Sequence, residues 1–136
     1  MTQNNSTSPT RSRDKVLQSL YEIEVGGASL TQVLKDQFTK KNYPYYKDLL
    51  EGVVGSQENI DITLEKAMDR PLKDLDPIER NALRLAVFEF QNTSLDRPII
   101  INESIRLTKK YGAAEGYKYV NAILDKILKE PKESPE

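Results

Sequence analysis

The chain has 136 residues, 38% hydrophobic and 30% charged, a length and composition that suit one folded domain. It contains no cysteine and no histidine, which excludes disulfides and thiolate metal sites and removes the side chains that enzymes most often use as nucleophile and general base. The formal net charge is −1, but residues 35–47 and 106–118 each carry a net charge of +3, whereas residues 61–79 are acidic.

The two ends of the chain are expected to be disordered tails. Residues 1–10 and 130–136 are polar and offer few apolar side chains that a core could bury. The N-terminus lacks the apolar stretch of a secretory signal, and nowhere do 18 apolar residues follow one another. We therefore expect a cytoplasmic, non-enzymatic protein without a cofactor, a metal site or a membrane contact, whose folded domain covers residues 11–129.

Helical spacing of apolar residues predicts the elements of the first half. The first helix is expected to begin at about Thr10 or Ser12 and to run to Val25, after which two glycines end it. Ser29 opens a short second helix, because Gln32 stands three residues later and can complete a capping box. A third helix is expected over residues 44–68, with two glycines inside it at which it could bend.

The second half contains the helix that we expect at the centre of the fold. Asp76 can cap its start, Pro77 suits its first turn, and Glu79 can close a capping box onto the Asp76 amide. The helix continues to about residue 91 and is apolar on most of its sides. Two more helices are expected over residues 98–111 and 115–129. The fold class that follows is all-α, a compact orthogonal bundle of six to seven helices.

Lysines and tyrosines alternate in the last two predicted helices. Lys109 and Lys110 precede Tyr111, and Lys118 stands between two further tyrosines. Lysines neutralise phosphates and tyrosine rings stack on bases, so this pattern favours binding of a single-stranded nucleic acid. Composition leaves a second interpretation open, in which the tyrosines belong to the core and the lysines form solvated helix faces.

Five segments of the chain resemble the NusB family of bacterial transcription antitermination factors, in the family's order and spacing. Two of them are NESIRLTKKYG at residues 102–112 and KYVNAILDK at residues 118–126. The others lie at residues 13–21, 46–53 and 79–90, so that the resemblance covers most of residues 11–128. It is more specific than any argument from composition.

The resemblance implies a function and a set of residues. Proteins of this family pair with NusE, which is also a small-subunit ribosomal protein, and the pair binds the single-stranded boxA element of nascent ribosomal RNA. The complex helps RNA polymerase read through terminators. Tyr21 and Glu79 match positions that meet NusE. The residues expected along the RNA are Arg11, Arg13, Lys15, Gln18, Lys118 and Tyr119.

Two other functions compete with this interpretation. A NusB-like domain also occurs at the N-terminus of some ribosomal RNA cytosine methyltransferases, although this chain has no cysteine that could serve in their catalysis. A helical scaffold that binds only proteins is the second alternative. The sequence also leaves open whether the chain forms a homodimer that covers the RNA-binding face.

Overall fold

A computed structural model of the chain describes residues 9–38 and 44–129, and every regular element in these ranges is helical. The elements are α1 (Pro9–Glu24), α2 (Leu30–Phe38), α3 (Pro44–Gly55), α4 (Gln57–Lys66), the short 3₁₀ helix η2 (Leu72–Asp74), α5 (Pro77–Asn92), α6 (Arg97–Tyr111) and α7 (Gly116–Lys129). The all-α prediction is thereby confirmed. No helix in the described ranges is long and apolar enough to cross a membrane.

The tails predicted at both ends of the chain fall largely outside the described residues. Residues 1–8 and 130–136 are not described, and neither are residues 39–43 between α2 and α3. The predicted N-terminal tail is wrong at its last two positions, because Pro9 and Thr10 form the first turn of α1. Proline fits this position, since the first amide of a helix has no intrahelical partner to lose.

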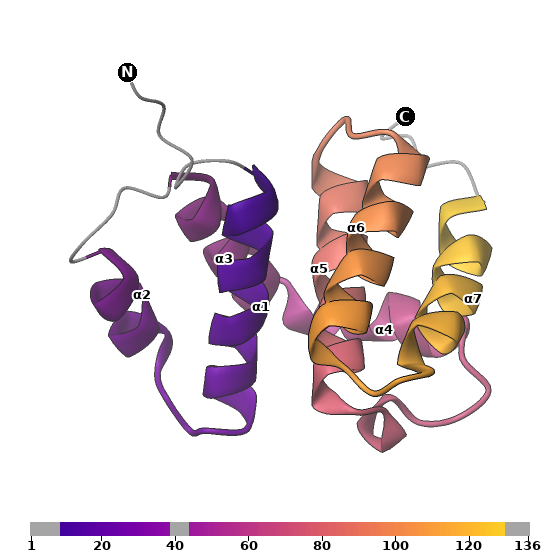
Figure 1. Cartoon of the computed structure of the whole chain (residues 1–136), viewed down its shortest axis with the longest axis horizontal. Coiled ribbons are helices and arrows are strands. Elements are labelled where there is room, and N and C mark those ends of the chain that lie inside the picture. Colours follow the sequence, from indigo (N-terminus) through magenta and orange to yellow (C-terminus); the bar gives the residue numbers. More distant parts are fainter. Residues whose placement is uncertain (1–8, 39–43, 130–136) are drawn as a thin grey trace.

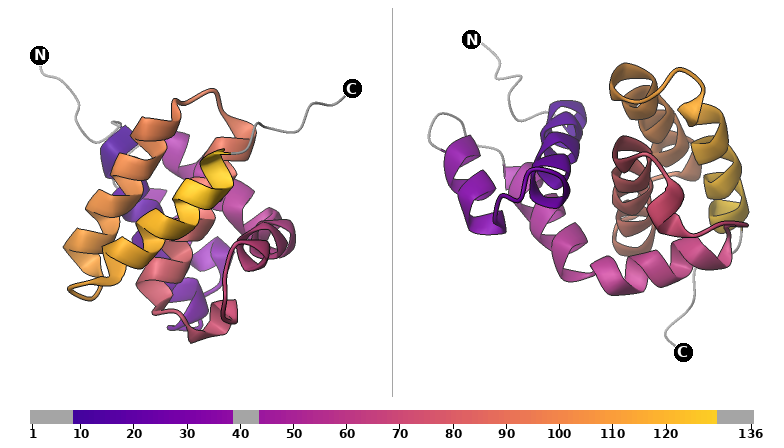
Figure 2. Two further views of the ribbon diagram at one scale, coloured as in Figure 1. Left: turned by 90° about the vertical axis from the view of Figure 1, so that its right-hand side faces the viewer. Right: turned by 90° about the horizontal axis from the view of Figure 1, so that it is seen from below.

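Helix α5 lies at the centre of the bundle, as the sequence predicts. It packs against five other helices, α1, α3, α4, α6 and α7. Figure 1 shows α1, α2 and α3 on one side of the molecule and α5, α6 and α7 on the other, and α4 connects the two groups along one edge in Figure 2. Eleven of the residues of α5 are buried, and five of these are polar or charged: Glu79, Arg80, Asn81, Arg84 and Glu89.

The predicted helix over residues 44–68 is in fact two helices. Helix α3 ends at Gly55 and α4 begins at Gln57, and the chain changes direction at Ser56 between them. Gly52 allows α3 to approach α5 closely, because a Cβ at this position would collide with the Phe88 ring. The apolar spacing continues across the break, since both helices direct apolar side chains into the same core, and for this reason the spacing does not show where α3 stops.

The buried position of Leu83 on α5 gives a test of this core. Leu83 is 0% exposed, so Leu83→Ala should lower the free energy of unfolding by ~2–5 kcal/mol. Ile62→Ala is the matched control, because Ile62 on α4 is 55% exposed and its truncation should change stability by less than ~0.5 kcal/mol. Chemical denaturation measures both variants, and equal midpoints for the two would contradict the placement of the core.

Candidate nucleic-acid interface

Polar contacts join α1 to α6 and α6 to α7, and Figure 1 shows α6 between the other two helices. On the α1 side, the Gln18 amide donates to the Tyr111 hydroxyl at 3.2 Å, and the Lys110 ammonium donates to Asp14 at 2.8 Å. On the α7 side, the Lys109 ammonium lies over the Tyr117 ring, 4.6 Å from its centroid. We call this surface the α1–α6–α7 face; its members are Asp14, Gln18, Lys109, Lys110, Tyr111 and Tyr117.

Arg13, which the sequence placed on the RNA path, lies in the interior. It is 4% exposed, and its Nε donates to both carboxylate oxygens of Glu89 on α5, at 3.0 and 2.9 Å. Its Nη1 donates to Glu103 on α6 at 3.1 Å, and the Tyr45 hydroxyl on α3 also donates to Glu89. This guanidinium therefore holds α1 against three other helices and does not face solvent.

A chain of ionic contacts continues from Arg13 to the surface. Glu103 accepts two hydrogen bonds of 3.1 Å from Arg106, and Arg106 Nη2 is 2.8 Å from Asp14 on α1. Asp14 then contacts Lys110, whose side chain is 55% exposed. We call these six charged residues the α1–α6 ionic cluster: Arg13, Arg106, Lys110, Asp14, Glu89 and Glu103.

The other predicted RNA residues of α1 share the outer side of this helix. Arg11 and Gln18 are exposed and Lys15 is partly exposed. These three residues stand four and three positions apart, so they lie along one side of the helix. Arg13, two positions from both Arg11 and Lys15, points about 200° away from them, which directs it into the interior.

On α7, Lys118 and Tyr119 have different surroundings. Lys118 is exposed and pairs with Glu115 of the preceding turn. The Tyr119 ring lies under the Arg70 guanidinium, whose central carbon is 4.2 Å from the ring centroid, and its hydroxyl donates to Asp69 at 3.3 Å. The sequence did not single out Arg70, because it belongs to an acidic segment that is distant from α7 in sequence.

The two residues predicted to meet NusE differ strongly in exposure. Tyr21 on α1 is 39% exposed, and Val25, four residues later, is 51% exposed. These two side chains form an apolar patch on the surface. Glu79 is buried, and its carboxylate lies against Gly116, where a Cβ would collide with it. Burial, together with a smaller effect of Asp76, raises the pKa of Glu79.

The predicted capping box at the start of α5 is confirmed only for Asp76. The Asp76 carboxylate accepts a hydrogen bond of 2.8 Å from the Ile78 amide. Glu79 does not close the box, because its carboxylate is directed toward Gly116 at the start of α7. The contact of Glu79 with α7 therefore replaces the local capping hydrogen bond to the Asp76 amide. At Ser29 and Gln32 the full capping box forms as predicted.

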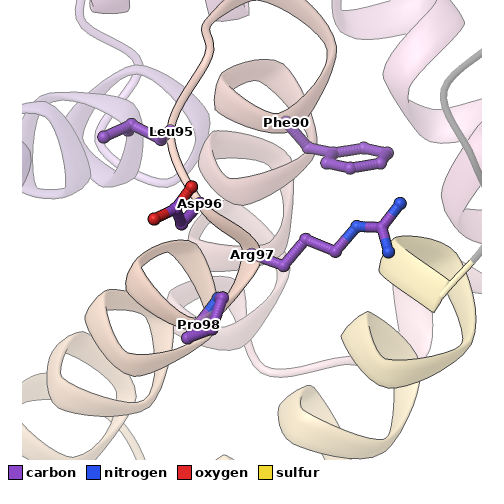
Figure 3. Close-up of a pocket in the computed structure, with 5 residues that line it drawn as sticks. All are labelled: Phe90, Leu95, Asp96, Arg97 and Pro98. Atoms are coloured by element: carbon purple, nitrogen blue, oxygen red, sulfur yellow. The ribbon is translucent and has the colours of Figure 1, made fainter.

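A pocket of about 400 Å³ lies at the turn between α5 and α6. Figure 3 shows Arg97 extending toward the Phe90 ring, and its guanidinium carbon is 5.8 Å from the ring centroid. No residue predicted to meet RNA or NusE lines this pocket. Among the residues that the structure describes, no group of three potential metal ligands comes together.

Comparisons with known proteins support one family. Residues 10–129 match the sequence model of the NusB family. The chain is 34% identical to transcription antitermination protein NusB of Psychromonas ingrahamii, over 88% of this chain and 86% of that protein. It is 36% identical to the protein of the same name from Alcanivorax borkumensis, over 93% and 91% of the two chains.

Solved structures of the same family are similar throughout. NusB of T. maritima matches with a TM-score of 0.81 and 27% identity, over 93% of this chain and 95% of that one. A crystal structure of antitermination factors NusB and NusE in complex with dsRNA contains a similar chain, with a TM-score of 0.75 and 30% identity. The match covers 88% of this chain and 95% of that chain.

The α1–α6 ionic cluster predicts a specific acid sensitivity. Burial alone would raise the pKa of Glu103, but its contacts with Arg106 and Arg13 outweigh burial and lower that pKa. A lowered folded-state pKa stabilises the protein above the unfolded-state value of about 4.3, and this stability is lost as the pH falls below that value. Glu103→Gln should therefore be less stable at pH 7 and lose less further stability on acidification.

Thermal unfolding between pH 7 and pH 3 measures the effect. Glu51→Gln is the control for loss of one surface negative charge, because Glu51 is exposed and forms only an i,i+4 pair with Lys47. Acid-unfolding curves of identical steepness for the parent and Glu103→Gln would mean that the cluster does not contribute to the pH dependence.

Proposed function

The chain belongs to the NusB family, and from this membership and its surface we propose that it is a transcription antitermination factor. In this proposal it binds the single-stranded boxA element of nascent ribosomal RNA together with NusE, and the complex helps RNA polymerase read through terminators. It acts in the cytoplasm and is not an enzyme. The observation that carries the proposal is the α1–α6–α7 face, where lysines and tyrosines of α6 and α7 lie beside polar residues of α1.

This face has the chemistry that a single RNA strand requires. Lys109 on α6 supplies charge for phosphates between the exposed residues of α1 and those of α7. We assign Arg11, Lys15, Gln18 and Lys118 to the RNA path, and Tyr119 to stacking on a base. Arg13 has a different task in this proposal, because its guanidinium is bound to Glu89 and Glu103. It orients the helix that carries the other contacts.

The apolar patch of Tyr21 and Val25 is the proposed contact with NusE. Exposed apolar side chains with acidic neighbours suit a basic ribosomal protein, because apolar area supplies affinity and charge supplies orientation. Glu22 provides an exposed acidic side chain on the same part of α1. Glu79 is buried, so in this proposal it acts on the partner through its charge.

The test of the function is boxA binding in the presence of NusE. The pair should bind boxA RNA more tightly than a scrambled RNA of the same length and composition. A scaffold that binds only proteins would bind NusE and neither RNA. Binding of NusE together with equal affinity for both RNAs would contradict the proposal of boxA recognition.

Variants of α7 separate the two kinds of RNA contact. The affinity for RNA falls as the salt concentration rises, and Lys118→Gln should make this dependence flatter. The slope of log affinity against log salt should change by ~0.7, the value for one phosphate contact on a single strand. Tyr119→Ala should cost ~1–3 kcal/mol without changing the slope, whereas Tyr119→Phe should bind nearly as the parent does. Lys129→Gln, at the other end of α7, is the control and should leave affinity unchanged. Normal binding by folded Tyr119→Ala would remove Tyr119 from the RNA path.

A variant at Glu79 tests the partner surface. Glu79→Lys should weaken NusE binding, because it places a positive charge opposite a basic protein. Gly116→Ala is the matched variant: it keeps the charge of Glu79 but displaces its carboxylate, and we expect a smaller loss. Calorimetry measures NusE affinity, and thermal unfolding identifies any loss of stability. Unchanged NusE affinity of both folded variants would place Glu79 outside the interface.

A further inference from the structure

Three polar groups converge at Asp14, beneath the α1–α6–α7 face. Lys110 Nζ and the Tyr111 hydroxyl lie 2.8 and 2.9 Å from its Oδ2, and Arg106 Nη2 lies 2.8 Å from its Oδ1. The Asp14 side chain is only 14% exposed, whereas that of Lys110 is 55% exposed. Asp14 therefore lies underneath the cation that an approaching polyanion would meet first.

The contacts of Asp14 have the chemistry of a bound phosphate. An anionic oxygen group accepts from an ammonium and a tyrosine hydroxyl and lies beside a guanidinium, and an RNA phosphate would use the same donors. Burial alone would raise the pKa of Asp14, but Arg106, Lys110 and Tyr111 outweigh burial and lower that pKa. The carboxylate is therefore charged at neutral pH.

The α1–α6 ionic cluster is electrically neutral as a whole. Its three cations, Arg13, Arg106 and Lys110, are matched by the carboxylates of Asp14, Glu89 and Glu103. A neutral cluster contributes little long-range attraction for a polyanion. Loss of the Asp14 charge would leave a net charge of +1 directly below the proposed RNA path.

Among its cationic partners, Asp14 is most important for the neutralisation of Lys110. Arg106 has a second carboxylate partner, Glu103, with which it forms two hydrogen bonds. In the described part of the chain, Lys110 has Asp14 as its only carboxylate partner within ion-pair distance. Without Asp14, Arg106 would therefore remain neutralised, and the ammonium of Lys110 would be released.

We propose that Asp14 is an internal competitor for RNA phosphate, which neutralises Lys110 and thereby limits the affinity of the α1–α6–α7 face for single-stranded RNA. This inference rests on the proposed RNA-binding function and adds a residue that sets its strength. Lys110 contributes little to binding as long as Asp14 is charged. Its contribution appears when the carboxylate is removed.

The test uses poly(U) with the full chain alone, so that it does not depend on boxA recognition. Asp14→Asn should bind poly(U) about two- to fivefold more tightly at low salt, the range that corresponds to one exposed ion pair. The slope of log affinity against log salt should become steeper by ~0.7, for one additional phosphate contact. Asp125→Asn is the matched control; it removes the partner of Lys129 near the end of α7 and should change neither quantity.

Lys110→Gln gives an independent test that does not require the Asp14 variant to fold. In the parent this substitution should leave the salt slope unchanged, because the charge of Lys110 is already neutralised. In the Asp14→Asn background it should remove the gain in affinity and slope. Circular dichroism and denaturation establish that each variant is folded.

Two results would overturn the inference. One is a folded Asp14→Asn variant with the affinity and slope of the parent. The other is a single Lys110→Gln variant, with Asp14 present, whose slope of log affinity against log salt is flatter than that of the parent by ~0.7. Such a result would mean that Lys110 contacts a phosphate in the parent protein. Failure of the proposed function is distinguishable, because it appears as equal binding of boxA and scrambled RNA with NusE.

Discussion

The ion pair between Arg13 and Glu89 fixes the position of α1. The position of α1 in turn determines which of its side chains are exposed beside α6. The two residues are 76 positions apart in sequence and both side chains are almost fully buried. Each charge therefore requires the other, because a buried charge without a partner is strongly unfavourable. Tyr45 and Glu103 extend the same contact to α3 and α6. The outer side of α1 lies beside α6 as a consequence.

A second set of ion pairs holds the other end of α1. Glu24 pairs with Arg80 and Arg84 of α5, and Arg84 also pairs with Asp61 of α4. Apolar packing between the two ends stabilises the burial of α1 but does little to fix its orientation, since this packing depends mainly on the area removed from water. The guanidinium groups add direction because each can serve two acceptors in fixed geometry. Contacts at both ends thus determine the orientation of α1 as well as its burial.

The order of the helices and the central place of α5 could be predicted from the sequence, because apolar spacing and capping residues are local signals. The break at Ser56 could not, since α3 and α4 face one core and keep the same spacing. Arg13 could not be distinguished from Arg11 either. Whether an arginine reaches solvent or a buried carboxylate depends on residues that are distant in sequence. Glu79 shows the same limit, because its local capping role is replaced by a contact with α7.

The division between arginine and lysine explains why a nearly neutral chain can present a basic face. The arginines of the buried and partly buried ionic contacts are Arg13, Arg80, Arg84 and Arg106, whereas Lys109, Lys110 and Lys118 are exposed. A guanidinium is weakly hydrated and planar, so it tolerates burial between carboxylates, while an ammonium is strongly hydrated and stays near water. Much of the arginine charge is therefore cancelled inside the molecule. The positive charge of the α1–α6–α7 face comes from its lysines, and its size depends on how many of these lysines are paired with a carboxylate.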